Sequence, residues 1–350
     1  MAITLKENNK ILHSTSLVES PSQIERIKNV IPRLAKWYND FECAISLRFD
    51  DNLTSHIKYV IPVLNEFNFK ATFMTNPGRN NLLISYNKHK KFWENEVQLM
   101  GHRLGNHTMH HQGAKNMEEA EYEIGEPSKI IWKLYPKESK LNVFASGGGE
   151  KWNGKRWSKT DPEFKAILPK YHLIDLYNGR NNGVEVNSNF PQNQWKRIID
   201  HALAEKIHQT LIFHKVGNKN FIDFAKEMIS GFNNCFPKEQ FLSMVKYLDS
   251  KRSQVWVAPI IQIIKYRTEF ESAKLNFINS DEISSTYELK IDTDSKLYDQ
   301  ELSLIVSIKK DPGILKVYQD EKEIKIHQKS KGEFVVNVIP EDSKIKFKLI

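Results

Sequence analysis

The sequence predicts an α/β protein, a (β/α) barrel followed by a small all-β module. Short β-rich runs alternate with longer helical patterns from Cys43 to about Ala273. No Gly-x-Gly-x-x-Gly turn follows the first run, which disfavours a dinucleotide-binding sheet. After about residue 285, apolar and polar residues alternate, as in strands with one buried face. With 350 residues, the chain is long enough for two domains.

Seven short runs rich in β-branched and aromatic residues predict the strands of the barrel. They are 43–49, 69–74, 103–106, 141–145, 171–177, 210–213 and 254–258. Between them, apolar residues recur every three or four positions, for example in 57–67 and 198–207. This spacing places one apolar stripe on a helix. A strand followed by a helix, about seven times over, is typical of a parallel α/β fold.

The remaining parts of the chain complete a three-part organisation. We expect an N-terminal extension over 1–40, ending in a helix near 23–37 that packs on the barrel. The barrel itself is expected over 41–275 and a β-rich accessory module over 281–350. Within the module, Asp311-Pro312-Gly313 predicts a turn between two strands.

Composition excludes several classes of protein. The net charge is +8, but no Lys/Arg block resembles a nucleic-acid-binding arm, so no nucleic-acid partner is expected. Cys43 and Cys235 cannot form a disulfide framework. No apolar stretch is long enough to span a bilayer, and Met1 to Ser22 has no apolar run of signal-peptide type. Either the protein is cytosolic or its signal is absent from this sequence. The oligomeric state is left open.

The first candidate motif is Asp50-Asp51, which ends the first apolar strand. Adjacent side chains that leave a strand end can reach different partners. One carboxylate can bind a cation while its neighbour accepts a proton, which is the division of labour of a metal hydrolase. An Asp pair after a strand is also a common loop or cap.

The second motif is the stretch from Gly101 to His111, which begins on a short strand. His107 and His111 are four residues apart, so their imidazoles can converge on one ion if the intervening turn is helical. With Asp51 they form a set of two histidines and one carboxylate. Such a set suits Zn²⁺ and several other divalent ions.

The third motif is His214, at the end of the strand Thr210-Leu211-Ile212-Phe213. A histidine there can be a core residue. In barrels, however, catalytic groups gather at the carboxyl ends of the strands. On our strand assignment all three motifs end at that rim.

Together these motifs resemble those of the NodB-homology polysaccharide deacetylases, carbohydrate esterase family 4. The resemblance covers about 40–273 and rests on Asp50-Asp51, Ala71-Thr72-Phe73, Gly-His-x-x-Gly-Asn-His-Thr-x-x-His and Phe213-His214, with Val255-Trp256-Val257-Ala258-Pro259 near its end. It implies a distorted (β/α) barrel, usually seven-stranded, that removes N- or O-linked acetyl groups from a polysaccharide or glycan.

The resemblance also implies roles for individual residues. Asp50 would be the general base, and His214 would be the general acid. Asp51, His107 and His111 would hold one divalent metal ion, Zn²⁺ or another divalent transition metal. The partner would be an acetylated carbohydrate, and the protein would be secreted, periplasmic or at the cell surface.

Three departures from the family pattern affect the expected site. Arg48 and Asn52 replace the outer residues of Thr-Phe-Asp-Asp-Gly. The arginine of the third motif is absent, and Gly147-Gly148-Gly149 stands nearby instead. The backbone N–H groups around Gly148 are candidates to bind the oxyanion, and Arg48, Arg103 and Arg180 are candidates for the missing guanidinium. For the carboxylate that supports His214, the candidate is Asp175.

Two tryptophans follow the glycine-rich loop and are candidates for stacking on sugar rings. Trp152 and Trp157 are also of the type that packs inside proteins. Two alternative functions stay open: a catalytically inactive sugar-binding barrel, and a non-haem Fe(II) oxygenase with the same ligand set. The oxygenase has no use for the adjacent Asp50 or for His214.

Overall fold

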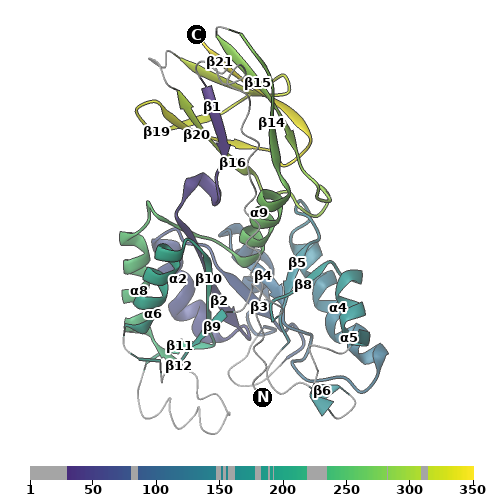
Figure 1. Cartoon of the computed structure of the whole chain (residues 1–350). Helices are drawn as coiled ribbons and strands as arrows, with labels where there is room; N and C mark the ends of the chain where they lie inside the picture. Colours follow the sequence, from purple (N-terminus) through teal and green to yellow (C-terminus); the bar gives the residue numbers. More distant parts are fainter. Residues whose placement is uncertain are drawn as a thin grey trace, which may run out of the picture.

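The computed structural model of the protein describes residues 30–350, apart from 80–85, 147–150, 153–154, 157–161, 178–182, 188–189, 192, 219–234, 282 and 309–313. Two parts are visible in Figure 1: a parallel sheet with its helices, and above it a β-sandwich. No helix among the described residues is long and apolar enough to cross a membrane.

The parallel sheet has the curled, open-barrel architecture that the sequence predicts. Along the sheet the strands follow the order β8-β5-β4-β3-β2-β10-β9, and β13 pairs beside them with the start of β2. Every pairing within this sheet is parallel. The strands are β2 (Cys43–Asp50), β3 (Thr72–Thr75), β4 (Arg103–Asn106), β5 (Asn142–Phe144), β8 (Leu173–Asp175), β9 (Gly183–Val186), β10 (His208–Phe213) and β13 (Val255–Val257).

The central strand β2 is buried along its whole length, as expected of a strand covered on both faces. Phe49 stacks on Phe73 of β3 at 5.2 Å and on Phe213 of β10 at 5.1 Å between ring centroids. The three rings are also register partners. Since the strands are parallel and in register here, the residues that follow them emerge at one rim.

Helices cover the sheet as the apolar stripes predict. They are η2 (His56–Val60), α2 (Ile61–Glu66), η3 (Phe92–Glu96), α3 (Val97–Leu99), α4 (Met117–Leu134), α5 (Pro162–Lys170), α6 (Gln194–Glu205), α8 (Lys238–Ser250) and α9 (Ile260–Ser272). The short helix η1 (Tyr38–Asp40) instead contacts strands of the C-terminal sandwich. The stripe over 57–67 falls on η2 and α2, where Val60, Ile61 and Leu64 are buried. The stripe over 198–207 falls mainly on α6.

Strand β9 is the element of the sheet that the sequence did not predict. It has only four residues, begins with Gly183 and carries the charged Glu185. Both features are unusual in a buried parallel strand. Pairing with β10 from Thr210 to Phe213 holds it in place, which is a tertiary contact that no local pattern shows.

The C-terminal residues form the predicted all-β unit, with two antiparallel sheets. The five-stranded sheet contains, in order, β14 (Lys274–Ser280), β15 (Ser284–Lys290), β21 (Ser343–Leu349), β17 (Leu315–Gln319) and β18 (Lys322–Ile324). The four-stranded sheet contains β1 (Val30–Leu34), β16 (Leu302–Ile308), β20 (Glu333–Val338) and β19 (Ile326–Ser330). The turn at 311–313 lies outside the described residues.

The helix predicted over 23–37 is wrong in its described part. Val30–Leu34 is a strand that pairs antiparallel with β16, so the N-terminal segment joins the C-terminal sandwich. Pro32 lies inside β1, which is an edge strand of its sheet. An edge strand tolerates proline because the backbone N–H groups on its open side have no neighbouring strand to donate to. A helix interior does not tolerate proline, because each N–H there donates to a carbonyl one turn earlier.

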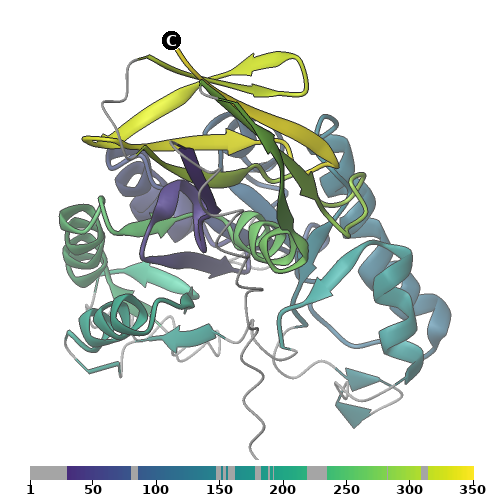
Figure 2. The ribbon, with the colours of Figure 1, turned by 45° about the horizontal axis from the view of Figure 1, so that its top comes forward.

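Helix α9 lies where the barrel meets the sandwich (Figures 1 and 2). Its Ile263 and Tyr266 belong to one buried cluster with Trp256 of the barrel and Leu304 of the sandwich. The Tyr266 hydroxyl also donates to the carbonyl of Ala35, at 2.8 Å. The two parts therefore share an apolar core.

Glu269 on α9 is fully buried at this junction and predicts a pH-dependent stability. Burial, with the nearby Asp299 charge, raises the pKa of its carboxyl to about 8, although the Gln300 N–H and Lys265 favour the charged form. A carboxyl with a raised native pKa stabilises the folded state at low pH. That contribution is lost as the pH rises from the unfolded value near 4.5 to about 8.

We therefore expect Glu269→Gln, which cannot ionise, to raise Tm at pH 8.5 by roughly 2–6 °C and to change it little at pH 5. Thermal melts across this range measure the effect. The exposed Glu301 supplies the control variant Glu301→Gln. If Glu269→Gln loses stability with pH as steeply as the parent protein, the burial argument is wrong.

Candidate active site

The rim of the parallel sheet carries a sharp turn directly after β2. Asp51 and Asn52 both have a positive φ, +80° and +49°, which Asp and Asn tolerate better than other residues with a side chain. The Asn52 side chain accepts from the backbone N–H of Asn76 at 3.0 Å, and the Asn76 amide donates to the carbonyl of Thr108 at 3.1 Å. Asn52 thus fits a position where the family has glycine, and Asn52 and Asn76 together link three rim loops.

The structure brings Asp51, His107 and His111 together. The Asp51 Oδ1 atom lies 3.7 Å from His107 Nε2 and 3.6 Å from His111 Nε2, and the three possible ligand atoms all lie within 4.8 Å of one another. The turn between the histidines is not the helical one that the four-residue spacing suggested. Thr108 and His111 instead have positive φ values of +67° and +55°.

His107 has the hydrogen bonding of a metal ligand. Its Nδ1 atom contacts the carbonyl of Ala145 at 2.5 Å, so this nitrogen carries the proton and Nε2 carries the lone pair. Nε2 is buried and has no hydrogen-bond partner among the described residues. Burial is the main cause that lowers the pKa of both His107 and His111 to about 4. Both imidazoles are therefore neutral near pH 7.

These observations fit a divalent ion bound by Asp51, His107 and His111. An orphaned buried nitrogen is costly unless something binds it. Two neutral imidazoles and one carboxylate leave coordination positions for water and substrate. The donor set suits zinc and other divalent transition metals equally.

Asp50 lies beside this set and is clamped by Arg48. The guanidinium Nε donates to Oδ1 at 2.7 Å and one terminal nitrogen to Oδ2 at 2.6 Å, with both side chains buried. Side chains two apart on a strand share a face. Burial alone would raise the pKa of Asp50, but Arg48, His107 and His214 lower it to about 2.

Of the two candidates for the missing guanidinium that the structure describes, Arg48 is the one that lies against Asp50. Its guanidinium centre is 5.7 Å from the ring centroid of Tyr177. Arg103 forms an ion pair with Glu138 instead. Arg180 and Gly148 lie outside the described residues.

Arg79 is a site residue that no sequence motif singled out. It follows β3, and its guanidinium donates to Asp51 Oδ1 at 2.6 Å. This is the same oxygen that lies nearest the two histidines. The rule that polar groups gather at the carboxyl ends of parallel strands would have included it.

His214 follows β10 at the rim and is one of the groups that lower the pKa of Asp50. Its backbone carbonyl contacts Nε2 of the buried His56 at 2.6 Å. The carboxylate beside it is Glu185 of β9, with Oε1 3.6 Å from His214 Nδ1. The supporting role expected of Asp175 stays a prediction. Asp175 lies on β8 and accepts from the backbone N–H of Tyr177.

The two tryptophans proposed for sugar stacking are not placed by the structure. Trp152 belongs to the short strand β6 (Lys151–Trp152), which pairs with β7 (Lys155–Arg156), but its side chain lies outside the description. Trp157 also lies outside the described residues. Their stacking role stays a prediction.

Comparison with known proteins agrees with the resemblance. The polysaccharide deacetylase family model matches residues 39–160. No curated protein matches the sequence. Solved structures with a similar fold include BA3943, a CE4 family pseudoenzyme from Bacillus anthracis, with 14% identity over 65% of this chain and 66% of that chain and a TM-score of 0.38.

Two further solved structures have comparable similarity. The peptidoglycan deacetylase PdaC from Bacillus subtilis has 14% identity over 66% of this chain and 94% of that chain, with a TM-score of 0.39. The family 4 carbohydrate esterase from Streptomyces lividans has 14% identity over 63% and 99%, with a TM-score of 0.36. The polysaccharide deacetylase family model covers the stretch of the chain that carries Asp50, Asp51, His107 and His111, and in that stretch the chain is similar to the family.

Proposed function

We propose that the protein is an active, metal-dependent deacetylase that hydrolyses N- or O-linked acetyl groups on a glycan. The observation that carries the proposal is the position of Asp50 beside the cluster of Asp51, His107 and His111. A divalent ion bound there would supply a Lewis acid for the acetyl carbonyl and would lower the pKa of a bound water. If the substrate is an acetylated glycan, we expect the protein to act outside the cytoplasm: secreted, in the periplasm or at the cell surface.

Asp50 is the proposed base that accepts the proton of the attacking water. Its low pKa keeps it ionised at any working pH, and the two hydrogen bonds from Arg48 fix the direction of its carboxylate. This orientation comes at some cost in basicity, because a base is most effective when its pKa is near the working pH.

His214 is the proposed acid that protonates the departing amine or alkoxide. It follows β10, the strand that pairs with β2, so it stands at the same rim of the sheet as Asp50. Glu185 lies 3.6 Å from His214 Nδ1, where it would help to orient the imidazole. No covalent acyl-enzyme is needed.

Acetate release from a panel of acetylated glycans tests the proposal. The panel contains a chitooligosaccharide, acetylated xylan and peptidoglycan, with 4-nitrophenyl acetate as a small substrate. We expect release from at least one glycan, its loss with chelator and its recovery when Zn²⁺ is added back. A metal-loaded protein that binds one of these glycans but releases no acetate from any of them would instead be the inactive sugar-binding barrel.

A further inference from the structure

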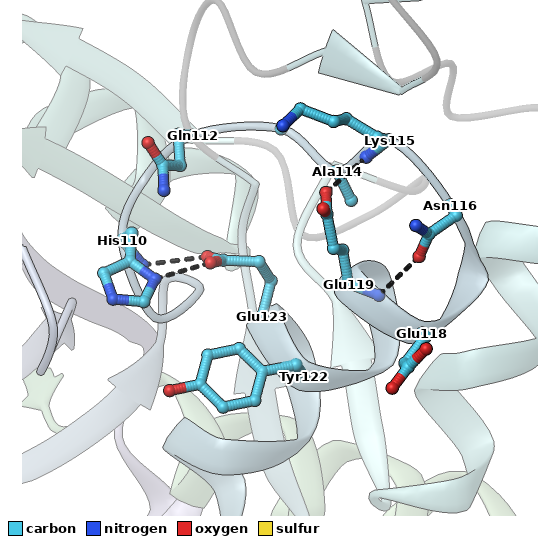
Figure 3. A pocket seen from close by; sticks show the side chains of 10 residues that line it. His110, Gln112, Ala114, Lys115, Asn116, Glu118, Glu119, Tyr122 and Glu123 are labelled. Carbon is cyan, nitrogen blue, oxygen red and sulfur yellow. Dashed lines mark hydrogen bonds and ion pairs between the residues drawn. The ribbon is translucent and has the colours of Figure 1, made fainter.

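A cavity of about 810 Å³ lies beside the loop that carries the metal-ligand candidates. It is formed by the residues after His110 and by the first turns of α4 (Figure 3). Its size is within the range of roughly 300–1,000 Å³ that small-molecule sites occupy. None of the residues assigned to chemistry lines it.

One lining residue, His110, connects this cavity to the loop of metal-ligand candidates and is firmly held. His110 lines the cavity and is the chain neighbour of His111. The buried Glu123 accepts from the His110 backbone N–H at 2.8 Å and contacts its Nδ1 at 2.6 Å. On the other side, a Cβ at Gly78 would lie 2.5 Å from His110 Nε2, so the ring packs directly on the chain next to Arg79.

The cavity offers the chemistry that recognises a sugar ring. Tyr122 is 49% exposed, and its ring lies nearly parallel to that of His110, at 14° and 6.0 Å. The apolar face of a pyranose can stack on such a ring while its hydroxyls find polar partners. Gln112 and Glu118 are exposed polar side chains that also line the cavity (Figure 3).

The charges that line the cavity indicate which class of sugar it can bind. The cavity is lined by three carboxylates and one lysine, namely Glu118, Glu119, Glu123 and Lys115. Glu123 is engaged by His110 and Glu119 by the backbone N–H of Lys115. Glu118 has no ion-pair or hydrogen-bond partner in the part of the chain that the structure describes. Such a lining repels uronic acids and accepts neutral or amino sugars.

We propose that this cavity is a subsite for a neutral or amino sugar unit near the unit that is deacetylated. The proposal rests on the deacetylase function, since it assigns the cavity to the same glycan. It predicts that oligomers of N-acetylglucosamine or glucosamine bind better than oligomers of uronic acids. Tyr122 provides the stacking face and Glu118 the charge selection.

The kinetic test uses the metal-loaded full-length protein with chitopentaose and 4-nitrophenyl acetate. Tyr122→Ala should raise KM for the pentamer by roughly 2- to 10-fold, the usual worth of an aromatic contact, with a much smaller change in kcat. Selectivity for the pentamer over the aryl acetate falls by the same factor. Tyr122→Phe keeps the ring and should restore KM. Tyr318→Ala, on the sandwich, is the matched control.

A binding test separates failure of this inference from failure of the proposed function. Calorimetric titration with glucosamine pentamer, which has no acetyl group to lose, needs no catalysis. We expect tighter binding than to oligogalacturonate, weaker binding in Tyr122→Ala, and a reduced preference in Glu118→Lys. If the protein releases no acetate while Tyr122→Ala still weakens binding, only the deacetylase function is lost. Equal binding and KM in the parent protein and Tyr122→Ala would overturn the subsite.

Discussion

Replacing Asp51 by asparagine is expected to abolish both metal binding and deacetylation. The carboxylate supplies the anionic ligand between two neutral imidazoles, and altering outer partners alone usually costs 10- to 100-fold in metal affinity. We therefore expect more than about 100-fold weaker binding, from about one ion per chain to almost none. Metal analysis of the dialysed protein and acetate release measure the two effects.

The backbone explains why asparagine is the better replacement. Asp51 has φ +80°. Asparagine tolerates this backbone conformation better than alanine does, so Asp51→Ala adds backbone strain to the loss of a ligand. Asp320, an exposed aspartate with φ +52° in the sandwich, gives the matched control Asp320→Asn. Full metal occupancy in both Asp51→Asn and Asp51→Ala would show that the ligand set is wrong.

Replacing Asp50 by asparagine should separate metal binding from chemistry. The amide cannot accept the proton of water, so we expect kcat to fall by roughly 10²- to 10⁴-fold while about one ion per chain stays bound. The same change leaves the buried Arg48 charge without its anionic partner. Breaking a buried pair in this way costs about 3–5 kcal/mol, so Tm should fall as well.

The double variant Arg48→Met/Asp50→Asn distinguishes these two effects. Removing both charges together avoids an isolated buried charge, so the double variant should regain most of the lost stability. It should nevertheless stay as inactive as Asp50→Asn. Recovery of activity along with stability would mean that Asp50 supports the fold and is not the base. Unchanged activity in Asp50→Asn itself would mean the same.

Local patterns predicted the parallel sheet, its helices and the all-β C-terminal unit. A period of two or of three to four residues records which face of an element is buried, and the chain's own neighbours determine it. Where the pattern was weak, the prediction failed. Strand β9 is too short and too polar to stand out, and Val30–Leu34 forms a strand only because β16, far along the chain, offers it a pairing edge.

The sequence by itself determined which groups stand at the carboxyl ends of β2, β4 and β10, because a polar residue after an apolar strand is a local feature. Asp50, Asp51, His107, His111 and His214 were found in this way. Only the tertiary structure decided what each of them touches. Arg48 clamps Asp50, Arg79 reaches Asp51, and Glu185 lies by His214. The reason is physical. Such contacts depend on the order of strands in the sheet and on loop turns with positive φ, and neither of these produces a periodic pattern in the sequence.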